Sequence, residues 1–261
     1  MKGAVEAQGS SCNDGAAWQV RCQPSCSAAG IIRTFTLDFL LAVPYDLSTP
    51  LGYFRAYLNM QLEDHGFIRS IYNNFYALPG GMYRCSQPSP ALIRKYHRQY
   101  GIKTIVNLRG ENPYGGYALE VATCRELGIE LVDFNLYSRD MPSVEEVLGA
   151  RDLFNRIAYP ALMHCKSGAD RAGLGATLYR HFRHGEPIAQ IRELRKKYGH
   201  FTLGRTAILD YFLQCYLDDN AREPMSFETW VETRYDQKAL TAKFDSGRMG
   251  NWFIDKLLRR E

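Results

Sequence analysis

The sequence predicts an α/β domain with a central, mostly parallel sheet flanked by helices, followed by a helical C-terminal extension. Short apolar runs of strand character alternate with helical segments between residues 82 and 183, which is typical of βαβ units. After Pro187 the pattern is helical throughout. The chain has 261 residues, 46% hydrophobic and 23% charged with net charge +4, and this composition excludes wholesale disorder, collagen and coiled coil.

We expect three regions along the chain. Residues 65–220 are long enough for one catalytic domain, and residues 221–261 form the helical extension. Residues 1–50 are rich in Ser, Gly, Asn and Pro and predict a poorly ordered tail, which a translation start near Met60 would leave out altogether. Metal binding by Cys12, Cys22 and Cys26 is the alternative, although no histidine lies nearby and their spacing does not match a zinc site.

Cysteine usage and hydropathy indicate the compartment. Seven cysteines are an odd number on a chain of this size, and they lack the paired spacing of a zinc site. A disulfide scaffold is therefore not expected, and a reducing, cytoplasmic location is predicted. No window approaches the roughly 20 apolar residues that span a bilayer.

The first elements of the domain carry clear helix signals. Residues 51–64 have the pattern of an amphipathic helix, and residues 82–84 that of a short strand. Ser89 is a candidate N-cap with Pro90 at the first helical position, and Gly101 would end this helix.

The next elements alternate between strands and helices. Ser143 and Glu146 have the spacing of a capping box that opens a helix through residue 157. The remaining strands are expected at 102–108, 130–136 and 161–163. The remaining helices are expected at 117–127, 172–183, 188–198, 206–217, 227–235 and 251–260.

One segment stands apart, the run His-Cys-Lys-Ser-Gly-Ala-Asp-Arg-Ala-Gly at residues 164–173. It lies where a strand ends and a helix begins, so its backbone N–H groups would surround one point and bind an anion. Gly168 tolerates the positive φ that such a loop requires, and the planar guanidinium of Arg171 can hold two phosphate oxygens. The same donors would stabilise a thiolate at Cys165, placed to attack a bound phosphate.

The alternative interpretation is a buried structural cysteine beside an exposed arginine. A Cys followed six positions later by an Arg is weak evidence alone. The preceding His164, the central Gly168 and the strand-to-helix context together favour a phosphatase loop.

The segment HCKSGADRAG resembles the His-Cys-x5-Arg signature of the protein tyrosine phosphatase superfamily, in its compact dual-specificity branch. The segments YRCSQPSP (83–90), GIKTIVNLRGE (101–111) and LGRTAILDYF (203–212) are similar to parts of bacterial dual-specificity-phosphatase-like proteins. The resemblance covers about residues 65–217. It implies a cysteine-phosphatase fold, hydrolysis of phosphomonoesters through a cysteinyl-phosphate, and no metal or other cofactor.

The resemblance also implies a role for each loop residue. Cys165 would be the nucleophile and Arg171 the phosphate clamp, while His164 would tune the thiolate. The other substrate-binding residues would be those of the loop itself: Lys166, Ser167, Gly168, Ala169 and Asp170.

The general acid is expected to be an aspartate on a loop upstream of the cysteine. Asp140 fits best, because it follows a strand and precedes a capped helix. Asp133 is a rival by spacing but falls in a strand, where a structural role is expected. Asp170 is a second rival, because some phosphoinositide-type members carry an aspartate directly before the arginine.

Ala172 departs from the pattern of the family, which usually has Ser or Thr directly after the arginine to help the thiolate leave. Ser167 could compensate, or the second step could be slow. A catalytically decayed phosphate-binding module is therefore an alternative. Arsenate reductases and sulfurtransferases also use a cysteine loop, but they fit poorly, because this loop lies late in the chain after several strand–helix units and the surrounding segments resemble phosphatases.

The substrate is expected to be phosphotyrosine in proteins, with a phosphoinositide, inositol phosphate or other lipid phosphate as the alternative. Lys166 inside the loop would suit more than one phosphate.

Residues 180–205 hold seven Arg or Lys against two Glu, which is a solvated surface or an electrostatic guide for anions. No nucleic-acid module appears. Residues 252–260 either pack on the domain or make a peripheral membrane contact. The sequence makes no prediction of the oligomeric state.

Overall fold

The computed structural model describes residues 45–202 and 204–258 of the chain. Its strands are β1 (Tyr76–Ala77), β2 (Met82–Ser86), β3 (Thr104–Asn107), β4 (Glu130–Asp133) and β5 (Ala161–Cys165). Its α-helices are α2 (Pro50–Leu62), α3 (Gly66–Ile71), α4 (Pro90–Tyr100), α5 (Gly115–Leu127), α6 (Val144–Arg156), α7 (Asp170–His184), α8 (Ile208–Arg222), α9 (Phe227–Thr233) and α10 (Gln237–Leu258). Short 3₁₀ turns are η1 (Pro79–Gly81), η2 (Ile188–Gln190), η3 (Lys196–Tyr198) and η4 (Arg205–Ala207).

The five strands form one sheet in the order β1-β2-β5-β3-β4. Only β1 is antiparallel to its neighbour, so the predicted mostly parallel sheet is confirmed. β5 lies in the centre, with Ser86 of β2 opposite Cys165 in the register. Cys165 therefore ends the central strand, at the carboxyl edge where open parallel sheets bind ligands.

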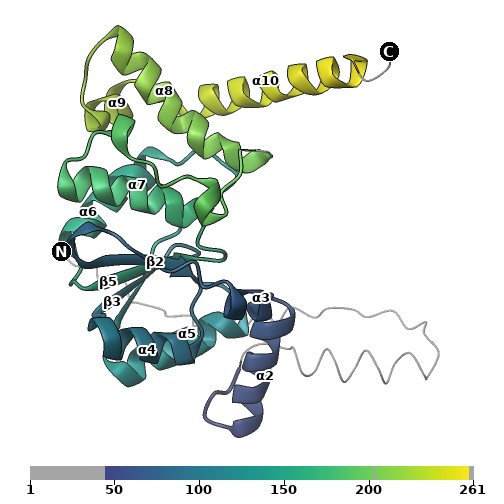
Figure 1. Cartoon of the computed structure of the whole chain (residues 1–261), viewed down its shortest axis with the longest axis vertical. Helices are drawn as coiled ribbons and strands as arrows, with labels where there is room; N and C mark the ends of the chain where they lie inside the picture. The colour runs from purple at the N-terminus through teal and green to yellow at the C-terminus, as the bar shows by residue number, and fades with distance from the viewer. Residues whose placement is uncertain (1–44, 203, 259–261) are drawn as a thin grey trace, which may run out of the picture. The chain divides into compact units, whose positions relative to one another are not determined.

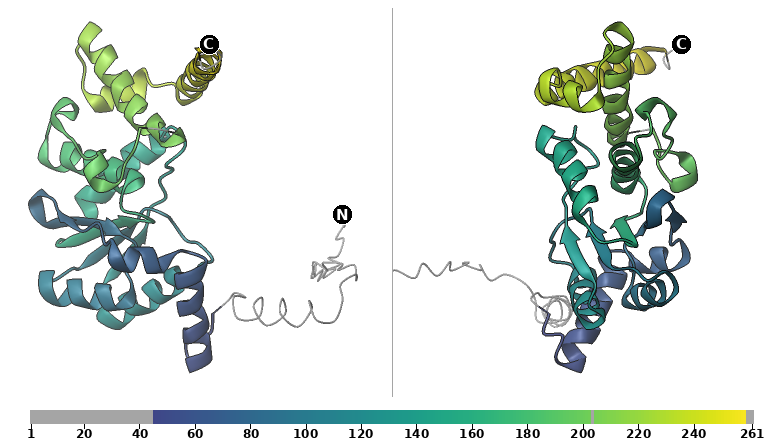
Figure 2. Two further views of the ribbon diagram at one scale, coloured as in Figure 1. Left: turned by 45° about the vertical axis from the view of Figure 1, so that its right-hand side comes forward. Right: turned by 90° about the vertical axis from the view of Figure 1, so that its left-hand side faces the viewer.

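Helices cover both faces of the sheet, with α4 and α5 on one face and α6 and α7 on the other (Figure 1). The α8–α9 pair packs on the α6–α7 layer, on the side away from the sheet (Figure 2). Phe227 of α9 joins this layer to α7, with its ring centroid 6.0 Å from that of Phe182.

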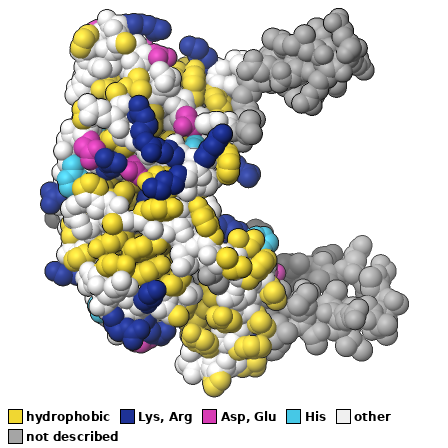
Figure 3. Space-filling model, in the orientation of Figure 1, with side chains coloured by type: hydrophobic (Ala, Val, Ile, Leu, Met, Phe, Trp, Pro, Cys, Tyr) yellow, Lys and Arg dark blue, Asp and Glu magenta, His cyan; other side chains and the backbone are white. Residues whose placement is uncertain are grey.

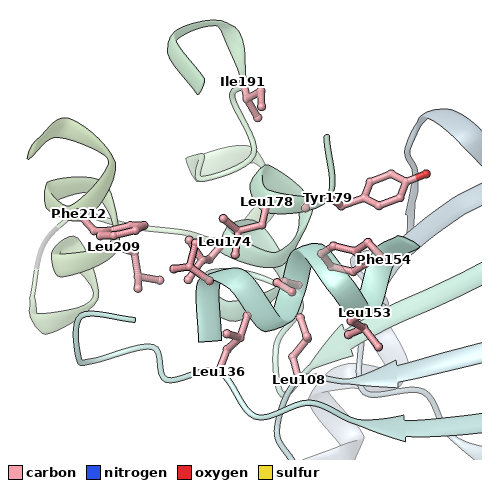
Figure 4. Packing of buried hydrophobic residues seen from close by; sticks show 14 of the residues in the cluster. Leu108, Leu136, Leu153, Phe154, Leu174, Leu178, Tyr179, Ile191, Leu209 and Phe212 are labelled. Carbon is pink, nitrogen blue, oxygen red and sulfur yellow. The ribbon is translucent and has the colours of Figure 1, made fainter. Parts of the chain in front are cut away.

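The larger hydrophobic core lies between the sheet and the α6–α7 layer. Leu108 after β3 and Leu136 after β4 face Phe154 of α6 and Leu174 of α7, and Phe212 of α8 extends the core outward (Figure 4). All five side chains are at most 2% exposed. The helix that begins at the cysteine loop is thus packed between the sheet and the C-terminal helices.

The predicted helix ends are confirmed. The Ser89 side chain accepts a hydrogen bond from the Leu92 N–H, and Gly101 ends α4 at φ 66°. The capping box of α6 has both of its hydrogen bonds, between Ser143 and Glu146. These caps depend only on near neighbours in the sequence, which is why the sequence predicts them.

The prediction of one helix over residues 188–198 is wrong. The segment contains η2 and η3 separated by extended backbone. Glu193 gives the physical reason, because its carbonyl accepts from Arg84 at 3.1 Å instead of from the next helical turn. Its carboxylate binds Arg84 at 2.9 Å and Arg180 at 2.7 Å. A buried ion pair here outweighs the local helical pattern.

Some predictions fall wholly or partly outside the described residues. These are the expected tail up to residue 44 with its three cysteines, and the side chains of residues 252–260. The last predicted helix is part of α10, which begins much earlier, at Gln237. Among residues 45–202 and 204–258, no helix is both long and apolar enough to cross a membrane.

Candidate active site

The loop after β5 surrounds the sulfur of Cys165. Cys165 is 2% exposed, and the Gly168 N–H donates to its Sγ at 3.2 Å. α7 begins at Asp170, so its N-terminal turn follows the loop directly. A backbone donor on the sulfur and the helix N-terminus together place partial positive charge beside Sγ.

Two side chains from outside the loop hold its carbonyls on the outer side. Arg84 Nη2 donates to the carbonyls of Gly168 at 2.8 Å and Ala169 at 3.2 Å. Asn74 Nδ2 donates to the carbonyl of Ser167 at 3.0 Å. In a trans peptide the N–H points opposite to the C=O, so these three contacts turn the following N–H groups toward the sulfur side. Such an arrangement of N–H groups is the one that an anion-binding cradle requires.

The Arg84 side chain is fully buried, and both of its terminal nitrogens are hydrogen-bonded, while Nε has no hydrogen-bond partner among the described residues. Besides the loop carbonyls it binds Glu193, and its guanidinium carbon lies 4.3 Å from the centre of the Tyr198 ring. A buried cation without such partners would be strongly destabilising. No role for this residue was predicted from the sequence, although an arginine within a buried strand was a usable signal.

Gly168 is required by the space around it as well as by its backbone. Its φ is 72°, a conformation that L residues rarely adopt. A Cβ at this position would lie 2.6 Å from the backbone of Cys85 and Ser86 in β2. The loop therefore packs so closely on β2 that only glycine fits.

Arg171 lies in the first turn of α7 and is half-buried. Within the part of the chain that the structure describes, its guanidinium has no carboxylate within ion-pair distance. It is therefore free to bind an incoming anion. Ala172 is fully buried behind it, so no hydroxyl stands at that position.

His164 is held by a buried polar chain beneath the loop. Its Nε2 lies 2.7 Å from Glu120 Oε1, and Glu120 Oε2 accepts from Gln87 at 3.1 Å. Gln87 Oε1 in turn accepts from Arg109. Glu120 and His164 are both fully buried, so the residue before Cys165 lies against a carboxylate of α5, which is bound in turn from the segment after β2.

The same chain ends on Asp64, a buried carboxylate between α2 and α3. Asp64 binds Arg109 at 2.7 Å, Arg69 at 3.0 Å and the loop residue Lys166 at 3.2 Å. Burial alone would raise the pKa of Asp64, but the three cations outweigh it and hold that pKa below its usual value. The N-terminal helices thus contribute a charged partner to the cysteine loop.

Asp170 is clamped by a charged histidine. His200 Nδ1 lies 2.6 Å from Asp170, and its Nε2 lies 2.7 Å from Asp210 of α8. Burial would lower the pKa of His200, but the two carboxylates raise it to about 9. An imidazolium can donate from both ring nitrogens, whereas a neutral imidazole can donate from only one. The first turn of α7 is thereby tied to α8.

The two upstream aspartates differ in their contacts. Asp133 uses both oxygens, accepting from Asn107 at 2.7 Å and from Tyr117 at 2.7 Å. The Asp140 side chain is 61% exposed, and its carboxylate lies 3.6 Å from Arg205. Asp140 therefore has more freedom to meet a substrate than Asp133.

The basic stretch at 180–205 is partly neutralised within the fold. Arg180 binds both Glu186, at 2.6 Å, and Glu193. Arg205 binds Asp245 of α10. An electrostatic guide for anions would depend on the other basic residues of the stretch, which are Arg183, Arg192, Arg195, Lys196 and Lys197.

A comparison with family models decides the relationship. Residues 80–205 match the family described as "DSP-PTPase phosphatase fused to NAD+ Kinase". This domain belongs to the protein tyrosine phosphatase superfamily, in its dual-specificity-like branch. The matched segment contains the cysteine loop and Asp140, so the chain carries a cysteine-phosphatase domain.

Several solved structures are similar to the phosphatase domain at low identity. TpbA from P. aeruginosa is 19% identical over 55% of this chain and 84% of its own, with a TM-score of 0.43. The catalytic core of the PP-IP phosphatase SIW14 from S. cerevisiae is 19% identical over 60% of this chain and 98% of its own, with a TM-score of 0.44. A putative phosphatase from Shewanella putrefaciens CN-32 is 18% identical over 61% and 97%, with a TM-score of 0.45. No curated protein matches the chain.

Replacing Gly168 by Ala should lower the turnover of an aryl phosphate by about a hundredfold, because the new Cβ forces the loop away from β2. The matched control is Gly185→Ala, which has a φ of 65° but no atom within 4 Å of the added Cβ. The control should lose about 1 kcal/mol of stability and keep its activity. Wild-type turnover in Gly168→Ala would contradict the close packing of the loop.

The His200 clamp predicts a pH-dependent stability. The pKa of His200 rises on folding to about 9, so its contribution is complete below the unfolded value of about 6.5 and is lost as pH rises toward 9. Between pH 6 and 9.5, wild type should lose roughly 2 kcal/mol more of unfolding free energy than His200→Gln in urea titrations. His97→Gln is the control, because its ring meets the Ile102 carbonyl and not a carboxylate. Parallel curves for wild type and His200→Gln would refute the clamp.

Proposed function

We propose that this phosphatase domain hydrolyses phosphomonoesters through a cysteinyl-phosphate intermediate, with protein phosphotyrosine as the substrate. The observation that supports this most is the Gly168 N–H that donates to Cys165 Sγ, in a loop whose carbonyls are held by Arg84 and Asn74. The tyrosine phosphatase type of the matched family favours the aryl phosphate substrate.

The first step transfers the phosphoryl group to sulfur. The dianionic phosphate binds in the cradle, and Arg171 holds two of its oxygens. The Cys165 thiolate attacks phosphorus, the P–O bond to the alcohol breaks, and Asp140 gives its proton to the leaving oxygen. The loop donors stay with the transferring group and stabilise the charge of the transition state.

The second step releases phosphate. Asp140, now a carboxylate, takes a proton from water, whose oxygen attacks phosphorus. The P–S bond breaks, and the thiolate of Cys165 is restored with inorganic phosphate. Ala172 offers no hydroxyl to the departing sulfur, so this step relies on the Gly168 N–H and on α7. The exposed Ser167 is a further candidate.

Asp140 is preferred to Asp170 as the general acid. The carboxylate of Asp170 lies 2.6 Å from Nδ1 of His200, whose pKa is raised to about 9, so this carboxylate is already engaged by the imidazole. A general acid must carry a proton when the substrate binds. The mostly exposed Asp140 is open to solvent and to a substrate.

A lipid phosphate is the second candidate substrate. Of the eleven large hydrophobic side chains exposed in the described residues, nine lie within residues 51–72 of α2 and α3. They give these helices an apolar surface (Figure 3), and Asp64 between them binds Lys166 of the loop. Comparing kcat/KM for a phosphotyrosine peptide and for a lipid phosphate in vesicles distinguishes the two substrates, and a higher value for the vesicles would overturn the phosphotyrosine proposal.

Two substitutions test the roles of the proposed nucleophile and acid. Cys165→Ser should abolish hydrolysis of every substrate, whereas Cys215→Ser, a buried cysteine of α8, should remain active and vanadate-sensitive. Asp140→Asn should lower kcat by about 10²-fold or more for an alkyl phosphate but much less for p-nitrophenyl phosphate, whose leaving group needs no proton.

Either of two results would overturn these roles. An equal loss on both substrates in Asp140→Asn would remove Asp140 as the acid. Well-folded wild-type protein without activity under reducing conditions would favour the decayed phosphate-binding module over the enzyme.

A further inference from the structure

The loop that carries Asp140 is held by side chains from the far C-terminal part of the chain. Residues 134–143 connect β4 to α6, and Asp140 lies near the end of this connection. Tyr235 Oη donates to the Pro142 carbonyl at 2.6 Å. Gln237 Nε2 donates to the Met141 carbonyl at 2.7 Å. The carbonyls of the two residues after Asp140 are therefore bound by Gln237, the first residue of α10, and by Tyr235, two residues before it.

The residue before Asp140 is held as well. Arg205 Nε donates to the Arg139 carbonyl at 2.8 Å, and the same guanidinium lies 3.6 Å from the Asp140 carboxylate. Arg205 also binds Asp245, two turns into α10. The backbone on both sides of Asp140 is thus tied, directly or through Arg205, to residues 235–245.

Of these anchors, Tyr235 is buried. Tyr235 is 9% exposed, and its ring packs against Phe212 of α8 and Trp230 of α9, with centroid distances of 5.2 and 5.1 Å. Burial raises the pKa of Tyr235, so its hydroxyl keeps the proton that it donates to Pro142. Met141 is 1% exposed, which fixes the loop on its inner side.

The side chain of Asp140 differs from this fixed backbone. It is 61% exposed, and its one ion pair among the described residues is the 3.6 Å contact with Arg205. A carboxyl group that must donate a proton and then accept one needs a fixed position and an accessible oxygen. The hydrogen bonds to the carbonyls of residues 139, 141 and 142 fix the position of the backbone and leave the carboxylate accessible.

We propose that Tyr235 and Gln237 are positioning residues for the general acid, which makes the C-terminal helical region a working part of the phosphatase site. The inference rests on the proposed role of Asp140. Both residues lie beyond the segment 80–205 that matches the phosphatase family, so this chain adds the anchor to the matched domain.

Two substrates whose leaving groups differ in their need for a proton distinguish a positioning role from a general effect on stability. Tyr235→Phe removes the hydroxyl and keeps the ring, and Gln237→Met removes the amide at similar volume. Each should lower kcat for an alkyl phosphate about tenfold, a part of the roughly 10²–10⁴-fold effect of general acid catalysis. Each should leave kcat for p-nitrophenyl phosphate within about twofold, since that leaving group needs no acid.

The chain offers matched controls for both substitutions. Tyr216 is also buried on α8 and donates to the Met225 carbonyl, away from the Asp140 loop. Gln214 binds Asp218 on the exposed side of the same helix. Tyr216→Phe and Gln214→Met should keep the wild-type ratio of kcat for the alkyl phosphate to kcat for p-nitrophenyl phosphate.

A double-variant comparison completes the test. In an Asp140→Asn background, Tyr235→Phe and Gln237→Met should have no further effect on the ratio, because the group they position is gone. A wild-type ratio in both single variants, while Asp140→Asn loses alkyl phosphate turnover, would overturn the positioning role and leave the proposed function standing. An unchanged ratio in Asp140→Asn would overturn both the role of Asp140 as the general acid and the positioning role of Tyr235 and Gln237. Cys165→Ser would still test the nucleophile. If Tyr235→Phe fails to fold, Gln237→Met alone decides.

Discussion

The site depends on one buried interaction, the contact of the Arg84 guanidinium with the carbonyls of the cysteine loop. A loop with its carbonyls turned inward would repel a phosphate, and the chain prevents this by giving those carbonyls a cationic partner on the outer side. The arginine in turn needs a buried carboxylate, which Glu193 supplies. That requirement explains why residues 188–198 do not form the helix that their sequence favours.

Segments outside residues 80–205 also supply charged partners to the loop and to the first turn of α7. Asp64 of the N-terminal helices binds Lys166, and Asp210 of α8 shares His200 with Asp170. Lys166 thus receives a partner of opposite charge from the segment between α2 and α3, and Asp170 is joined to α8 through the histidine that the two carboxylates share. The phosphatase loop is therefore stabilised from both ends of the described chain, while Arg171 is left for the substrate.

The sequence predicts what depends on local pattern. The strand–helix order, the caps at Ser89 and Ser143 and the cysteine loop follow from neighbouring residues, and the structure and the family match confirm them. Arg84, Asn74 and Asp64 were missed as loop partners because their contacts span 84, 93 and 102 positions, as the differences 168 − 84, 167 − 74 and 166 − 64 show. The Arg84 contact, for example, appears only once the sheet order places β2 beside β5.

The central claim is that outward anchoring of the loop carbonyls creates the anion cradle. The most direct measurement is a calorimetric titration with vanadate of the paired variant Arg84→Met and Glu193→Gln, which removes the anchor without leaving a buried charge unpaired. The account predicts a folded protein whose vanadate affinity is at least about tenfold weaker than that of wild type, a loss of about 1.4 kcal/mol. A folded variant with wild-type vanadate affinity would contradict it.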